Sequence, residues 1–141
     1  MRSCFAFALA GILTACQTPH EFVDDPRAVE SSIQIGQLKY SSGGRVLVGE
    51  VIVRHWGTTG FQIEFQKGVG VPLLNLRMDG TTARAEGPLA RGVWQGPPNR
   101  APKPLRGWIE LRDAFAAQKT LAGLTHTSRD SQQRFDFILS R

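Results

Sequence analysis

The sequence predicts a mainly β (α+β) fold, in which a curved antiparallel sheet or open half-barrel carries one helix packed on its concave face. Three observations predict it. Apolar and polar residues alternate in short runs between residues 33 and 86, turn-forming residues separate these runs at hairpin distance, and one amphipathic segment, residues 104–121, is available to cover an apolar sheet face. We therefore expect a single β-rich domain over residues 33–141.

The first expected strand changes phase part of the way along. Ile33 and Ile35 alternate with polar residues, whereas Leu38 and Tyr40 alternate one position out of step. An extra residue in a strand produces such a slip, so we expect a β-bulge at Gly36.

The following strands are predicted by the same alternation. Residues 45–56 are apolar on both sets of alternating positions, which predicts burial of both faces. An Asp79-Gly80 pair is typical of a hairpin turn. Further strands are expected at residues 61–66, 71–79, 81–86 and 133–139.

Residues 87–104 interrupt the strand pattern. They hold five prolines, and no acidic residue lies between Glu86 and Glu110. We expect a long basic loop here, because structureless connections of this length are usually functional or disordered. Residues 104–121 then show helical spacing of apolar residues, with Gly123 as the expected stop.

The pattern of residues at the N-terminus predicts an export signal. Arg2 precedes an uncharged, mostly apolar run at residues 5–13, which is shorter than the roughly 20 residues that span a bilayer but fits a secretory signal. The run ends at Leu13-Thr14-Ala15-Cys16, which resembles the lipobox of bacterial lipoproteins. The resemblance implies removal of residues 1–15 as a signal peptide, lipid attachment to Cys16, and a tether over residues 16–32.

Cysteine content and charge agree with this interpretation. Cys4 would leave with the signal, so Cys16 would be the only cysteine of the mature chain, and lipidation would account for it. Loss of Arg2 lowers the net charge from +5 to +4, which suits anionic headgroups and is weak support for nucleic acid. We expect a membrane partner and no nucleic acid.

The resemblance also bears on which membrane is used. Gln17 follows Cys16, whereas Asp at that position is the best-known signal for retention in the inner membrane among such lipoproteins. The expected location is therefore the outer membrane, with the domain facing the periplasm.

The order of strands, proline-rich loop, helix and strand resembles lipoproteins of the Lol-carrier type. The residues that carry the likeness are the lipobox, the strand meander, and Gly70-Val71-Pro72-Leu73-Leu74-Asn75-Leu76 with Asp79-Gly80. The resemblance implies an open half-barrel with a helical plug and an apolar cavity. The chain is short for that fold.

Catalytic and metal-binding patterns are not found in the sequence. His20 lies in the tether, His55 ends a strand, and His126 lies in a polar stretch. There is no nucleophile-elbow motif, no Cys-x-x-Cys and no His-x-x-x-His. We expect neither an enzyme nor a metal or cofactor protein.

Two sets of residues are candidates for binding. The first would line an acyl cavity of mostly apolar walls, although an ordinary core under one helix needs the same residues: Phe61, Ile63, Phe65, Leu74, Leu76, Met78, Phe135 and Phe137. The second lies in the basic loop, which either touches a membrane or partner or is simply solvated: Arg91, Trp94, Arg100 and Lys103. Trp94 could instead pack back on the sheet.

These observations leave two functions open. One is a lipid-binding or acyl-binding envelope lipoprotein that works by hydrophobic transfer without covalent chemistry. The alternative is a structural or assembly lipoprotein whose sheet edge or loop binds another envelope protein.

Overall fold

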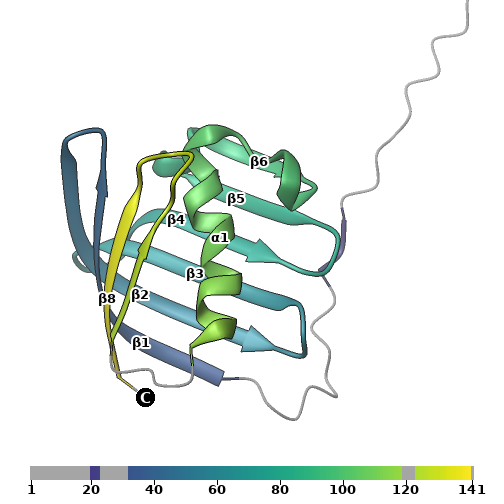
Figure 1. The fold of residues 1–141 in the computed structure, drawn as a ribbon, viewed down its shortest axis with the longest axis horizontal. Helices are drawn as coiled ribbons and strands as arrows, with labels where there is room; N and C mark the ends of the chain where they lie inside the picture. Colours follow the sequence, from purple (N-terminus) through teal and green to yellow (C-terminus); the bar gives the residue numbers. More distant parts are fainter. Residues whose placement is uncertain (1–19, 23–31, 119–122, 141) are drawn as a thin grey trace, which may run out of the picture.

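The computed structural model describes residues 20–22, 32–118 and 123–140. Its strands form one antiparallel sheet in the order β6-β5-β4-β3-β2-β1-β8-β7, with a single α-helix (Figure 1). This confirms the predicted mainly β fold. The elements are β1 (Ser32–Ser42), β2 (Arg45–Trp56), β3 (Gly60–Lys67), β4 (Val71–Met78), β5 (Ala83–Gly87), η1 (Pro88–Ala90), β6 (Gly92–Gly96), η2 (Pro98–Arg100), α1 (Lys103–Ala117), β7 (Gly123–Thr127) and β8 (Arg134–Ser140).

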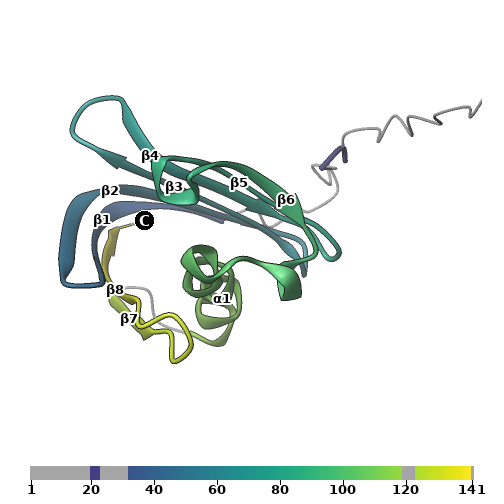
Figure 2. The same cartoon turned by 90° about the horizontal axis from the view of Figure 1, so that it is seen from above.

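The sheet curls around α1, so that β7 and β8 lie on the opposite side of the helix from β3, β4 and β5 (Figure 2). The helix buries one face, made by Leu105, Trp108, Leu111 and Phe115. Trp108 lies at the centre, with its ring 5.0 Å from the Tyr40 ring and 4.9 Å from the Phe135 ring. Large apolar side chains from both sides of the curl therefore share one core.

β1 is regular, and the predicted bulge at Gly36 is wrong. Each residue of β1 pairs with one residue of β2 without a shift of register. Gln34, Leu38 and Tyr40 are buried, so Ile33 and Ile35 face outward. Gly36 is required for a different reason. β8 runs antiparallel beside β1 with Leu139 opposite Gly36, and a Cβ at position 36 would overlap the backbone carbonyl of Ile138.

The prediction that β2 is buried on both faces is also wrong. Val51 and Val53 are fully buried, whereas Val46 and Val48 are exposed. Pairing with β3 begins only at Glu50, so the first part of β2 has β1 as its one neighbouring strand. The β1–β2 hairpin therefore extends past the body of the sheet (Figure 1).

Residues 87–104 are not the long loop that was predicted. They contain β6 and two short 3-10 helices, and β6 pairs with β5 from Gly92 opposite Gly87 to Gly96 opposite Ala83. The reversal uses left-handed backbone at Arg91, with φ of 57°. A non-glycine residue seldom adopts that conformation, which hides this hairpin from sequence reasoning.

The helix and the region after it also differ in part from prediction. α1 begins at Lys103 and ends at Ala117, and Gln118 is already extended. Residues 119–122 lie outside the described residues. Gly123, expected only as a helix stop, begins β7, a strand that the sequence did not predict.

Candidate functional site

The eight apolar residues proposed as cavity lining are the core of the domain. They are between 0% and 3% exposed and lie beneath α1. The helix fills the concave face with four large side chains, so a ligand could reach this face only if α1 moved. The residues are Phe61, Ile63, Phe65, Leu74, Leu76, Met78, Phe135 and Phe137.

An open hollow lies at the end of the half-barrel where α1 begins. It encloses about 610 Å³ between the β1–β2 hairpin, η1, the start of α1 and the β7–β8 turn. We call it the basic groove, and its lining residues are Tyr40, Ser42, Arg45, Leu47, Pro88, Leu89, Arg91, Lys103, Pro104, Ser131 and Gln133.

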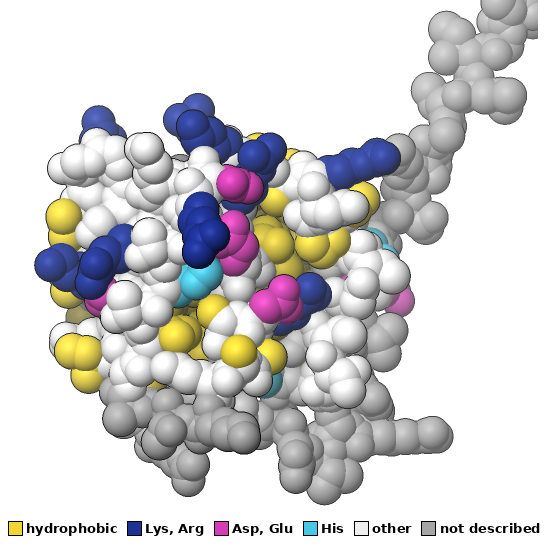
Figure 3. All heavy atoms as spheres, viewed as in Figure 1, with side chains coloured by type: hydrophobic (Ala, Val, Ile, Leu, Met, Phe, Trp, Pro, Cys, Tyr) yellow, Lys and Arg dark blue, Asp and Glu magenta, His cyan; other side chains and the backbone are white. Residues whose placement is uncertain are grey.

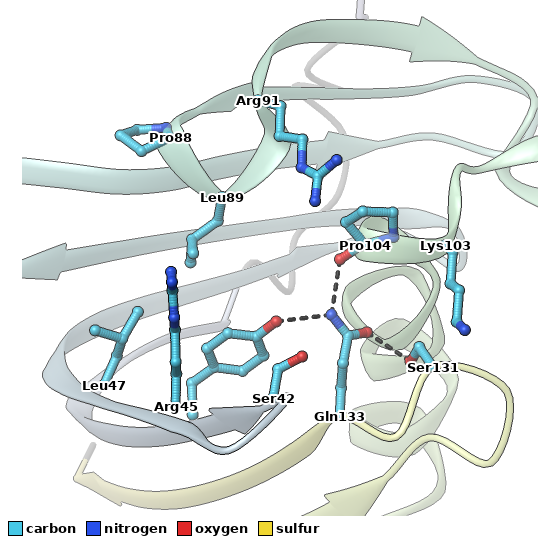
Figure 4. A pocket seen from close by; sticks show the side chains of 11 residues that line it. Ser42, Arg45, Leu47, Pro88, Leu89, Arg91, Lys103, Pro104, Ser131 and Gln133 are labelled. Atoms are coloured by element: carbon cyan, nitrogen blue, oxygen red, sulfur yellow. Dashed lines mark hydrogen bonds between the residues drawn. The ribbon is translucent and has the colours of Figure 1, made fainter.

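The basic groove combines cations with apolar walls. Arg45, Arg91 and Lys103 contribute positive charge, and none of the described residues that line the groove is acidic. In Figure 4, Arg45 rises from the hairpin towards Leu89, and Arg91 extends from the opposite wall towards Pro104. Such a mixture suits a molecule with an anionic end and an apolar body.

Gln133 forms the floor of the groove and is itself buried. Its Nε2 donates to the Tyr40 hydroxyl and to the Pro104 carbonyl, both at 2.7 Å. Its Oε1 accepts from the Ser131 hydroxyl at 2.7 Å and from the Gly107 N–H at 3.0 Å. Both N–H donors of the amide and both acceptor positions of its oxygen are used. This side chain therefore links β1, α1 and the segment that leads into β8, and it has no hydrogen-bonding position left for a ligand.

The structure separates the four residues predicted to touch a membrane or partner. Arg91 and Lys103 both line the basic groove. Arg100 ends η2 and does not line the groove, and Trp94 lies in β6 opposite Ala85, where it packs against the core. Trp94 therefore packs back on the sheet.

Arg45 is the groove residue that sequence reasoning missed. It directly follows the turn at Gly43 and Gly44, both at positive φ, and pairs with Ser42. Only the tertiary fold brings this position to η1 and to the start of α1.

On the face shown in Figure 3, Lys and Arg side chains gather along the upper edge, and acidic side chains lie nearer the centre.

Among the described residues, His126 is arranged differently from the histidine of a nucleophilic triad. His126 Nε2 lies 2.9 Å from Glu110 Oε2, and the Ser128 hydroxyl donates to Glu110 Oε1 at 3.0 Å. The carboxylate thus sits between serine and imidazole, whereas general-base activation of a serine needs the imidazole next to the hydroxyl. These contacts fasten the β7–β8 hairpin to α1.

His55 is enclosed by aromatic rings. Its ring centroid lies 5.1 Å from that of Phe61 and 5.6 Å from that of Phe115. Burial lowers the pKa of the imidazole, because the charged form loses its hydration. The side chain is therefore held neutral at pH 7.

The described part of the tether docks on the sheet at the end away from the groove. His20 Nε2 contacts Asp79 Oδ2, and Phe22 lies under the Arg77 guanidinium, whose carbon is 5.4 Å from the ring centroid. Burial alone would raise the pKa of Asp79, but hydrogen bonds from the Thr81 N–H, His20 and the Thr82 N–H lower it to about 2. Residues 1–15, Cys16 and the remainder of the tether lie outside the described residues.

Within the described ranges, three or more His, Cys, Asp or Glu side chains do not come together as a group that could hold a metal ion. In the same ranges, the helix of this chain is neither long nor apolar enough to span a membrane.

No protein-family model matches the chain, and no curated protein matches it in sequence.

Proposed function

We propose that this chain is a membrane-anchored envelope lipoprotein that binds an anionic amphiphile, a lipid or acyl group, in the basic groove. The observation that carries the proposal is the composition of the groove, where Arg45, Arg91 and Lys103 stand among apolar side chains. Pockets of about 300–1,000 Å³ with mostly apolar walls and a few polar groups are typical ligand sites. The groove, with about 610 Å³, falls within that range.

The charges would bind the headgroup and the walls would bind the chain. A phosphate or carboxylate can accept hydrogen bonds from the Arg45 and Arg91 guanidinium groups, which suit planar anions. Leu47, Leu89 and Pro88 offer apolar surface beside them. In this proposal the acyl chain lies against the groove rather than against the eight buried core residues, which α1 already covers.

Anchoring at Cys16 remains part of the proposal. Its support is the Leu13-Thr14-Ala15-Cys16 sequence after a short apolar run. Three residues lie between Cys16 and His20, and the four steps from residue to residue span at most about 14 Å of extended chain. An anchor at Cys16 would therefore hold the Asp79 end of the domain near the membrane, which is the outer membrane in this proposal. The basic groove would then lie at the end of the domain that is farther from the membrane.

The anchor has its own test. Radiolabelled palmitate should enter the chain in bacterial cells, and Cys16→Ser should abolish the labelling. Equal labelling of both forms, or labelling of neither, would remove the anchor from the account.

A second candidate function is binding of another envelope protein. Ile35 and Ile138 project from the convex face and are 55% and 70% exposed. They lie near one another because Ile138 pairs with Gln37, two positions along β1 from Ile35. An exposed apolar strip of this kind is a common feature of protein interfaces.

Native mass spectrometry of the full chain released from detergent tests amphiphile binding. We expect one tetradecanoic acid to bind and its methyl ester, which lacks the charge, to bind more weakly. Arg91→Gln should weaken binding of the acid, while Arg54→Gln, on the exposed side of β2, serves as the matched control. Equal binding of acid and ester, or binding of neither, would contradict the proposal and leave the convex strip as the better candidate.

A further inference from the structure

The basic groove holds more positive charge than one carboxylate can neutralise. Arg45, Arg91 and Lys103 line it, and none of the described residues that line it is acidic. In the described part of the chain, none of these three side chains forms an ion pair or a hydrogen bond. A bound fatty acid would therefore leave two positive charges in the groove without a negative partner. This surplus favours an anion with more than one negative charge.

The start of α1 adds to the positive charge of the groove. Lys103 is the first residue of the helix and Arg106 lies in the same turn, which contains no acidic residue. Helices usually place acidic side chains at this end, because the helix N-terminus carries partial positive charge. Basic side chains at this position destabilise the free protein slightly. An anion bound in the groove would relieve that repulsion.

The three cations can reach a single bound group. They come from three different segments, namely β2, the reversal between η1 and β6, and the start of α1, and all three residues are exposed. Arg and Lys side chains rotate about several bonds, so they can turn towards a group held between the walls that Figure 4 shows. A phosphate monoester offers three terminal oxygens as acceptors, whereas a carboxylate offers two.

We propose that the charged end of the ligand in the basic groove is a phosphate monoester, which is bound by Arg45, Arg91 and Lys103. The inference rests on the proposed function, in which the groove binds an anionic amphiphile, and it names the chemical class of the headgroup. A phosphate monoester carries nearly two negative charges at pH 7. Arg45 and Arg91 bind the oxygens that a carboxylate would also present, and Lys103 binds the third oxygen.

Native mass spectrometry of the full chain released from detergent tests the charge requirement. Tetradecyl phosphate is a monoester, and methyl tetradecyl phosphate has the same chain and phosphorus centre with one negative charge fewer. We expect the monoester to bind about fivefold more tightly, the factor that one further contact with a cation of this kind provides. Equal binding of the two would overturn the inference and leave the proposed function in place. Binding of neither phosphate, nor of tetradecanoic acid, would overturn both.

A second comparison distinguishes a lipid headgroup from a small soluble phosphate. Glycerol 3-phosphate is a monoester without the acyl chain, and it should bind at least about tenfold more weakly than tetradecyl phosphate, because the apolar walls of the groove contribute to lipid binding. Equal affinity of the two would support the phosphate assignment and would contradict the acyl part of the proposed function.

Lys103→Gln tests the residue that separates a phosphate from a carboxylate. The variant should bind tetradecyl phosphate about fivefold more weakly and tetradecanoic acid as well as the natural chain does. Its stability in urea should be unchanged or raised, because a cation is removed from a helix N-terminus, so weaker binding would not reflect unfolding.

Lys67→Gln is the matched control for this variant. Lys67 is the last residue of β3 and does not line the groove, so its loss removes the same charge and should leave both affinities unchanged. Equal losses for the phosphate and the fatty acid in Lys103→Gln, or equal effects of the two variants, would overturn the assignment of Lys103 to the phosphate.

Discussion

The backbone N–H of Gly107 in α1 donates to Gln133 Oε1 at 3.0 Å, which brings the helix backbone into direct contact with the side chain immediately before β8. A Cβ at position 107 would overlap that oxygen and would come within 2.9 Å of the Phe135 ring. The close approach sets the distance between helix and sheet, and with it the floor of the basic groove.

Gly107→Ala should therefore destabilise the domain. Alanine is favoured over glycine in helices by about 1 kcal/mol, so any net loss measures the overlap with Gln133 and Phe135. Overpacking costs about 1–3 kcal/mol, and the two contacts below 3.0 Å place this site in the upper part of that range, at about 2–3 kcal/mol. We therefore expect a net loss of about 1–2 kcal/mol in urea unfolding. Gly80→Ala is the matched control, because its new Cβ would be 3.6 Å from Thr59. Unchanged or raised stability of Gly107→Ala would mean that the contact is not tight.

The cations of the basic groove should each contribute to ligand binding. Each cation near an anionic surface is worth about 1 kcal/mol, or about fivefold in affinity. Arg45→Gln and Arg91→Gln should each weaken tetradecanoic acid binding by about this factor, and the double variant should weaken it more than either single variant, with a deviation from the product of the two factors because both cations contact one headgroup. The losses should shrink at high salt, because salt screens exposed charges. Losses that do not depend on salt would indicate a packing defect instead.

The stability of the domain should fall in mild acid because of His55. Burial lowers the folded-state pKa of His55, so the unfolded chain binds the proton first as pH falls. The contribution is complete above the unfolded value of about 6.5 and is lost progressively as pH falls from there towards the lower folded value. Urea unfolding of His55→Gln should show a flatter dependence on pH between 7 and 5. The same slope in both proteins would place the sensitivity elsewhere.

Asp79 should protect the β4–β5 turn above about pH 4. Its Oδ1 accepts from the N–H groups of Thr81 and Thr82, both at 2.8 Å. Because the pKa falls from 3.8 to about 2, the stabilisation is complete above 3.8 and is lost as pH falls to about 2. Asp79→Asn keeps an oxygen acceptor but loses the charge, so we expect a loss of about 1 kcal/mol at pH 7 and little further loss below pH 4. Thermal unfolding at pH 7 and pH 3 measures both, and parallel acid sensitivity of the two proteins would refute the role.

The alternation of apolar and polar residues allowed the central strands of the sheet to be predicted from the sequence. The two edge strands, β6 and β7, were not predicted. β3 shows clean alternation because Phe61, Ile63 and Phe65 face the helix and their neighbours face water. β7 buries only Leu124, and β6 buries none of its residues fully, so neither edge strand carries a periodic signal. The phase of β1 was predicted incorrectly. Gln34 faces inward, whereas Ile33 and Ile35 were expected to face inward.

The candidate site depended still more on tertiary structure. Arg91 and Lys103 were identified from the basic segment, but Arg45 lies more than 40 positions earlier in the chain and reaches the groove only through the β1–β2 hairpin. Gln34 Oε1 and Gln118 Oε1 are buried and lack a hydrogen-bond partner among the described residues. The sequence gives no sign of this, because burial and the missing donor are properties of the folded state.

The position of a bound acyl chain tests the groove most directly. Nuclear Overhauser effects between ¹³C-labelled tetradecanoic acid and the full chain should connect the acyl methylenes with the methyl groups of Leu47 and Leu89, which line the groove. The methyl groups of Leu74 and Leu76, covered by α1, should show none. Contacts to Leu74 and Leu76 without contacts to Leu89 would contradict the account, since the ligand would then occupy the space that the helix fills.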